Sequence, residues 1–99
     1  MNKENLEQGL TKLLKTFYTK KYERDFSDLT VVLDEYEEDA DDMDNEGNWV
    51  SAESYYFKVY SNNFNGLYPQ ELYDLARDLF KNIIGGQNWI DIEFGKYPL

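Results

Sequence analysis

The feature that most constrains this chain is an acidic run, residues 34–46, in which nine of thirteen side chains are carboxylates. No lysine or arginine lies between Asp25 and Phe57 to neutralise it. Carboxylates at this density repel one another, so they have to be solvated and screened or bound by something positive. The run therefore belongs on a surface of the molecule.

The segments on either side of the acidic run have the pattern of β-strands. Leu29–Leu33 is apolar and β-branched. In Tyr55–Ser61, alternation would put Tyr55, Phe57 and Val59 on one face, toward the core, and Tyr56, Lys58 and Tyr60 on the other. The sequence Asn45-Glu46-Gly47-Asn48 is a good chain reversal, because Gly47 can adopt a positive φ. We expect one long antiparallel hairpin with the acidic run at its far end.

Two helices are predicted from apolar residues spaced three and four apart. The first runs from about Asn5 to Tyr22, with Asn5 as its cap and Gln8 reaching back to it. The second begins near Pro69, and Gly85-Gly86 should end it with a left-handed cap. Each apolar stripe is wide enough to cover one face of a sheet.

The end of the chain predicts a third strand. From Trp89 to Phe94 the residues alternate, so that Ile90 and Ile92 share one face and Asp91 and Glu93 the other. The order α-β-β-α-β predicts a small α+β domain over residues 1–99. Its three-stranded sheet should be mainly antiparallel, with both helices packed on one face.

Composition excludes several kinds of chemistry. The 99 residues include neither cysteine nor histidine, so a disulfide framework, a Cys₂His₂-type zinc site, a thiol nucleophile and an imidazole base are all excluded. The serines lie outside any nucleophile-elbow motif, and no glycine-rich phosphate loop occurs. We expect no enzymatic activity and no cofactor, in a cytoplasmic protein without a membrane span.

The formal charge of −10 is distributed unevenly along the chain. Residues 1–24 hold six basic and three acidic side chains, whereas residues 25–99 hold four basic and seventeen acidic ones. Nucleic acids and anionic lipids repel such a protein, so neither is an expected partner. The expected partner is a basic protein surface.

The acidic run suggests how such a partner would be bound. In an extended strand Glu35, Glu37, Asp39 and Asp41 would share one face at intervals of about 6.6 Å, a ladder of negative charge. Two such rows approach the charge density of a nucleic acid and could occupy a cationic channel in its place. Nearby aromatic residues would then anchor the contact. The expected partner-binding residues are Asp34, Glu35, Tyr36, Glu37, Glu38, Asp39, Asp41, Asp42, Asp44, Glu46, Trp49 and Tyr56.

Two other interpretations of the same run stay open. A dedicated immunity protein would use identical physics to mask a basic toxin, since complementary charge speeds association and excludes wrong partners. Alternatively the hairpin is merely solvated, and its charge serves solubility.

The window Asp42–Glu53 resembles the calcium loop of EF-hand proteins. Acidic residues stand at its positions 1, 3, 5 and 12 and glycine at position 6, a spacing that lets six to eight oxygens surround Ca²⁺. The flanks are strands instead of helices, and Trp49 replaces the usual smaller residue at position 8. Any calcium site would use Asp42, Asp44, Glu46, Asn48 and Glu53.

These observations favour a small non-enzymatic inhibitor, and a nucleic-acid mimic before the alternatives. In size, acidity and lack of catalytic residues the chain looks like the neutralising proteins of phages and mobile elements, such as anti-restriction and anti-CRISPR inhibitors, or like toxin-immunity proteins.

Overall fold

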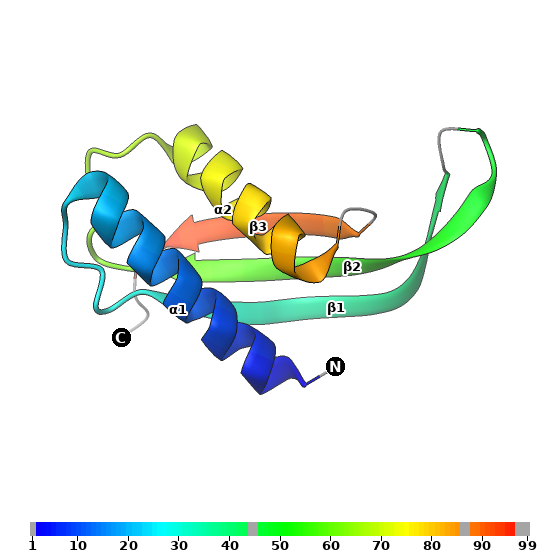
Figure 1. Cartoon of the computed structure of the whole chain (residues 1–99), viewed down its shortest axis with the longest axis horizontal. Helices are drawn as coiled ribbons and strands as arrows, with labels where there is room; N and C mark the ends of the chain where they lie inside the picture. Colours follow the sequence, from blue (N-terminus) through cyan, green and yellow to red (C-terminus); the bar gives the residue numbers. More distant parts are fainter. Residues whose placement is uncertain (1, 44–45, 86–87, 97–99) are drawn as a thin grey trace.

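The computed structural model has the predicted order of elements (Figure 1). It describes residues 2–43, 46–85 and 88–96, except for the side chains of 39–43 and 49–51. The elements are α1 (Lys3–Tyr22), β1 (Thr30–Met43), β2 (Trp49–Tyr60), α2 (Pro69–Ile84) and β3 (Trp89–Gly95). Among the described residues, no helix combines the length and apolarity needed to cross a bilayer.

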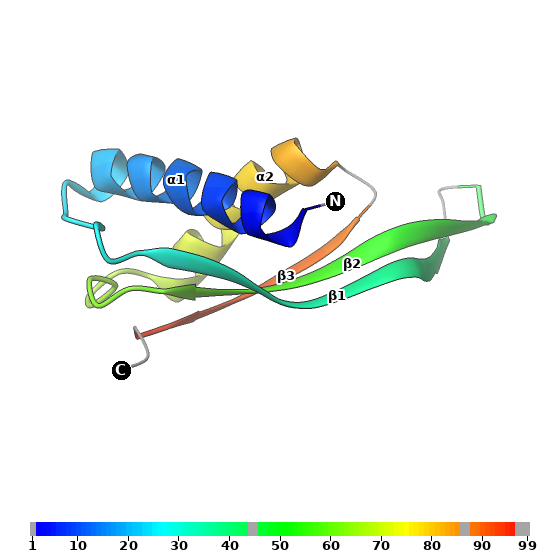
Figure 2. The ribbon, with the colours of Figure 1, turned by 90° about the horizontal axis from the view of Figure 1, so that it is seen from below.

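The three strands form one mixed sheet in the order β1-β2-β3. The long β1–β2 pair is the predicted antiparallel hairpin, and Gly47 in its turn has a φ of 85°. Strand β3 instead runs parallel to β2, because α2 carries the chain back across the sheet before β3 begins. Both helices lie on the same face of the sheet (Figure 2).

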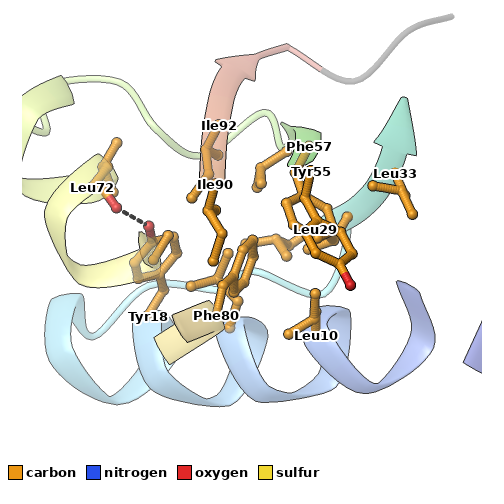
Figure 3. Close-up of a cluster of buried hydrophobic side chains, with 14 of the residues drawn as sticks. Leu10, Tyr18, Leu29, Leu33, Tyr55, Phe57, Leu72, Phe80, Ile90 and Ile92 are labelled. Carbon is orange, nitrogen blue, oxygen red and sulfur yellow. Dashed lines mark hydrogen bonds between the residues drawn. The ribbon is translucent and has the colours of Figure 1, made fainter. Parts of the chain in front are cut away.

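The core lies between the helices and this face of the sheet (Figure 3). The alternation in β2 buries Tyr55, Phe57 and Val59 under the helices, as the sequence predicted. The isoleucines of β3 join them. The buried side chains of the two helices are Leu10, Leu14, Tyr18, Leu72, Ala76 and Phe80.

A buried polar contact joins the two helices. The Tyr18 hydroxyl is enclosed in the core and donates to the Leu72 carbonyl oxygen at 2.6 Å. Burial raises the pKa of Tyr18 far above the ordinary value for tyrosine, so the hydroxyl stays protonated and keeps donating.

The predicted helix caps differ from those observed. Helix α1 begins two residues earlier than expected, and its cap is Asn2, whose side chain accepts from the Asn5 amide at 3.1 Å. Asn5 is thus inside the first turn, where its own amide needs a partner, and it cannot act as the cap. After α2, Gly85 has φ 114° and ψ 149°, which is not the left-handed helical conformation that was predicted for Gly85-Gly86; Gly86 lies outside the described residues.

Two side chains of α1 close the outer edge of β1. The Val31 amide donates to Thr11 Oγ1 at 3.0 Å, and the Leu33 amide donates to Glu7 Oε2 at 2.7 Å. Because β1 is at the edge of the sheet, these amides would otherwise face solvent.

The loops at one end of the sheet are also tied together. Arg24 donates to the carbonyl oxygens of Asn63 and Asn65 at 3.1 and 2.5 Å. Asp28 accepts from the Ser61 hydroxyl at 2.7 Å. At the other end the β1–β2 hairpin extends past both helices, so the molecule measures 44 × 25 × 19 Å (Figure 1).

Candidate functional site

The sheet face opposite the helices carries the alternate, mostly polar side chains of the strands that point away from the core. No described helix or strand covers this face (Figure 2). On β2, Tyr56 and Lys58 alternate with core residues, and on β3, Asp91 and Glu93 alternate with buried isoleucines. The register pairs Tyr56 with Asp91 and Lys58 with Glu93, so these four side chains form two adjacent rows.

A bulge adds carboxylates of β1 to the same face. The register shifts between Leu33 and Glu35, which leaves Asp34 as an extra residue. Strict alternation would have turned Glu35 toward the helices and Tyr36 away from them. With the extra residue, Glu35 pairs with a residue of the helix-free face, and Tyr36 packs on the core residue Tyr55 with ring centroids 5.0 Å apart.

We call this surface the acidic sheet face. It combines five carboxylates from the two outer strands with a single lysine. Its members are Asp34, Glu35, Glu37, Tyr56, Lys58, Asp91 and Glu93.

Tyr56 lies at the centre of the acidic sheet face. Its hydroxyl donates to Glu93 Oε2. Several effects raise the pKa of Tyr56 to about 12. The largest is this hydrogen bond; partial desolvation and the negative charges of Glu93, Asp91 and Asp34 contribute less. Carboxylates from both outer strands thus lie around one hydroxyl, although almost sixty residues separate Asp34 from Asp91 in the sequence.

Lys58 neutralises only a small part of this charge. Its Nζ lies 3.8 Å from Asp34 Oδ2, and both side chains are partly exposed. Exposed ion pairs of this kind are worth at most about 1 kcal/mol. The acidic sheet face therefore keeps a strongly negative character.

A shallow depression of about 470 Å³ lies on this surface, where the hairpin leaves the body of the molecule. Three acidic residues, two tyrosines and a serine line it. They are Asp34, Glu35, Tyr36, Glu37, Ser54 and Tyr56. An arginine or lysine head group that enters the depression would meet carboxylates beside the Tyr56 ring, an arrangement that suits both ionic and cation–π contacts.

Of the twelve predicted partner-binding residues, the structure groups Asp34, Glu35, Tyr36, Glu37 and Tyr56 around this depression. Glu38 and Glu46 are exposed further along the hairpin. The remaining predictions concern Asp44 and the side chains of Asp39, Asp41, Asp42 and Trp49, which lie outside the described residues.

The predicted ladder from Glu35 to Asp41 is interrupted, because the alternation of β1 is broken within it. A second register shift lies between Glu37 and Ala40, so β1 contains an extra residue there relative to β2. The four ladder residues therefore do not lie on one regularly alternating stretch of β1, and Glu35 and Glu37, before the shift, share the helix-free face as expected.

The calcium loop is only partly described. Glu53, its closing residue, lies within β2, and its carboxylate accepts a hydrogen bond from the Tyr55 hydroxyl. Asp44 and the Asp42 side chain lie outside the description. Within the described residues, no group of three or more acidic side chains is arranged to hold a metal ion.

The sequence interpretation missed the contributions of Asp91 and Glu93 to the site. Their alternation with isoleucines showed that they face away from the core, but it did not show which strand lies beside them. Comparisons with protein-family models, curated proteins and solved structures found no match for this chain.

Proposed function

We propose that this chain is a non-enzymatic neutralising protein that binds a basic protein surface through the acidic sheet face and the adjoining hairpin. One observation carries the proposal: the register gathers carboxylates of β1 and β3 on one uncovered face with a single lysine among them. Such a surface attracts cationic groups and repels acidic ones.

The favoured target is a nucleic-acid-binding protein of the cytoplasm. Along each strand alternate side chains are about 6.6 Å apart, and β1 and β3 are separated by about 9.6 Å. Two parallel rows of negative charge at these spacings resemble the phosphates that line a nucleic acid, and they would fit a groove that binds phosphates. Carboxylates would steer the encounter, while Tyr56 would contact the groove at the depression.

Affinity capture from a cell lysate tests the proposal. The full chain is immobilised, bound proteins are eluted with a salt gradient, and mass spectrometry identifies them. We expect a basic nucleic-acid-binding protein that added DNA or RNA displaces. A single partner that ignores nucleic acid would point to immunity against a toxin instead.

Matched charge variants locate the binding surface. The triple variant Glu35→Gln, Glu37→Gln, Asp91→Asn removes three charges from the acidic sheet face. The control Glu4→Gln, Asp74→Asn, Asp78→Asn removes three charges from exposed positions on the helices. We expect the first variant to lose the partner and the control to retain it. Equal capture by both variants would contradict the proposal.

A further inference from the structure

The two edges of the sheet differ in how well they are closed. The edge of β1 is blocked by the side chains of Thr11 and Glu7, and two register shifts distort the strand further along. Bulges and covering side chains both prevent another strand from pairing. The β1 edge is thus protected against added strands.

The backbone of β3 is regular and presents one set of its polar groups to the outside. All seven of its residues pair with β2 without a register shift. The Gly95 carbonyl oxygen accepts from the Ser61 amide at 3.1 Å, so the odd-numbered residues of β3 bond toward β2. The amide and carbonyl groups of Ile90, Ile92 and Phe94 therefore point toward the outer edge.

No other element occupies this edge among the described residues. The Ile92 amide donates to the carboxylate of its own neighbour, Asp91, at 3.0 Å. No hydrogen bond from another helix, strand or loop of the described chain reaches the outward groups of Ile90 or Phe94. The β3 edge thus retains the pairing capacity that the β1 edge has lost.

The side chains of β3 define which strand could pair there. Asp91 and Glu93 are exposed on the helix-free side, and Trp89 at the start of the strand is 55% exposed. A strand placed alongside would put every second side chain next to these carboxylates. Lysine or arginine is favoured at those positions, whereas a second copy of β3 would place like charges opposite one another.

We propose that the outer edge of β3 accepts an extended, cationic segment of the partner protein as a fourth strand. In that segment basic residues alternate with apolar ones, the basic side chains meeting Asp91 and Glu93 and the backbone bonding to Ile90, Ile92 and Phe94. This inference rests on the proposed function and adds the way in which the partner is held.

A synthetic peptide that alternates lysine and valine over seven residues is the probe. It is titrated into the full-length, ¹⁵N-labelled chain at about 20 mM salt, where charge attraction is strong. We expect the amides of Ile90, Ile92 and Phe94 to shift and to become protected from hydrogen exchange.

Two N-methylated peptides separate strand pairing from charge attraction. One is methylated at every lysine amide and the other at every valine amide, and both keep the charge of the probe. Only one of the two amide sets faces β3, so we expect one methylated peptide to bind at least about tenfold more weakly than the other. Equal affinity of the two would overturn the proposal.

Charge variants show which edge binds the peptide. Asp91→Asn with Glu93→Gln should weaken binding more than Asp74→Asn with Asp78→Asn on α2. Shifts confined to β1, or a loss of binding only in Glu35→Gln with Glu37→Gln, would overturn the edge proposal and leave the proposed function standing. Absence of peptide binding would also overturn the edge proposal. The proposed function would then still be tested by capture from the lysate with the charge variants of the acidic sheet face.

Discussion

Tyr56 shows how a single residue reports the charge of its surroundings. Its phenol is held protonated by Glu93 and by the carboxylates of both neighbouring strands, whereas in an unfolded chain it would ionise at its ordinary pKa of 10.0. The folded and unfolded states therefore hold different numbers of protons between these two values.

This difference predicts a fall in stability at high pH. Between about pH 10 and pH 12 the unfolded state releases the Tyr56 proton and the folded state keeps it, so the contribution present below pH 10 disappears as the pH rises. Urea unfolding across this range should show a shallower decline for Tyr56→Phe than for the natural chain. Parallel declines would contradict this assignment.

Replacing Gly9 by alanine should stabilise the folded chain. It lies within α1, where glycine costs about 1 kcal/mol relative to alanine. A Cβ built at this position meets no atom within 4 Å, and the backbone needs no positive φ. Gly9→Ala should therefore raise the free energy of unfolding by about 0.5–1 kcal/mol, measured by urea unfolding. A loss of stability would contradict this prediction.

At the level of elements, the bulge at Asp34 decides what β1 presents to each face. Before the bulge, Leu33 is buried in the core. After the bulge, Tyr36 lies on the same side of the sheet and packs against Tyr55. Because of the extra residue, Leu33 and Tyr36 both face the helices, while Glu35 faces the opposite side of the sheet.

Deleting Asp34 tests this interpretation. The deletion removes the extra residue, so Glu35 would follow Leu33 directly, and strict alternation would keep Glu35 on the helix-free side and Tyr36 against Tyr55. We therefore expect the Asp34 deletion to cost at most about 1 kcal/mol. Deleting Tyr36 should cost several kcal/mol, because a carboxylate would take the place of the aromatic ring whether the bulge is kept or lost. Circular dichroism during thermal unfolding measures both, and similar losses in the two variants would contradict the role of the bulge.

Over the whole molecule, charge opposes folding. The chain has a net charge of −10, and the fold concentrates five carboxylates on one side of the sheet. Increasing the salt concentration from about 0.01 M to about 0.1 M shortens the Debye length from about 30 Å to about 10 Å and weakens this repulsion.

Added salt should therefore raise the melting temperature. The rise should be smaller in Glu35→Gln, Glu37→Gln, Asp91→Asn, because that variant has less repulsion to screen. Scanning calorimetry over the salt series measures both chains. A melting temperature that falls with salt would show that ion pairs such as Lys58 with Asp34 outweigh the repulsion.

Much of the architecture was already determined by local patterns in the sequence. The three- and four-residue spacing of apolar side chains placed both helices, and alternation placed the buried face of β2 and β3. The charge of the acidic run predicted a surface position, and its described carboxylates, Asp34, Glu35, Glu37, Glu38 and Glu46, are exposed; Gly47 marked the turn. These predictions succeeded because helix period, strand alternation and turn conformation depend on near neighbours in the chain.

The candidate site depended on contacts between distant segments. Alternation showed that Asp91 and Glu93 face away from the core, but only the parallel pairing of β3 with β2 placed them beside Tyr56 and the carboxylates of β1. Likewise, the alternation of residues in a strand does not reveal where a bulge occurs. The face on which Glu35 lies therefore became known only from the pairing of β1 with β2. Local sequence determined which residues are polar and on which side of a strand they lie, whereas packing of the helices on the sheet decided which strands are neighbours, because that choice rests on burial summed over the whole core.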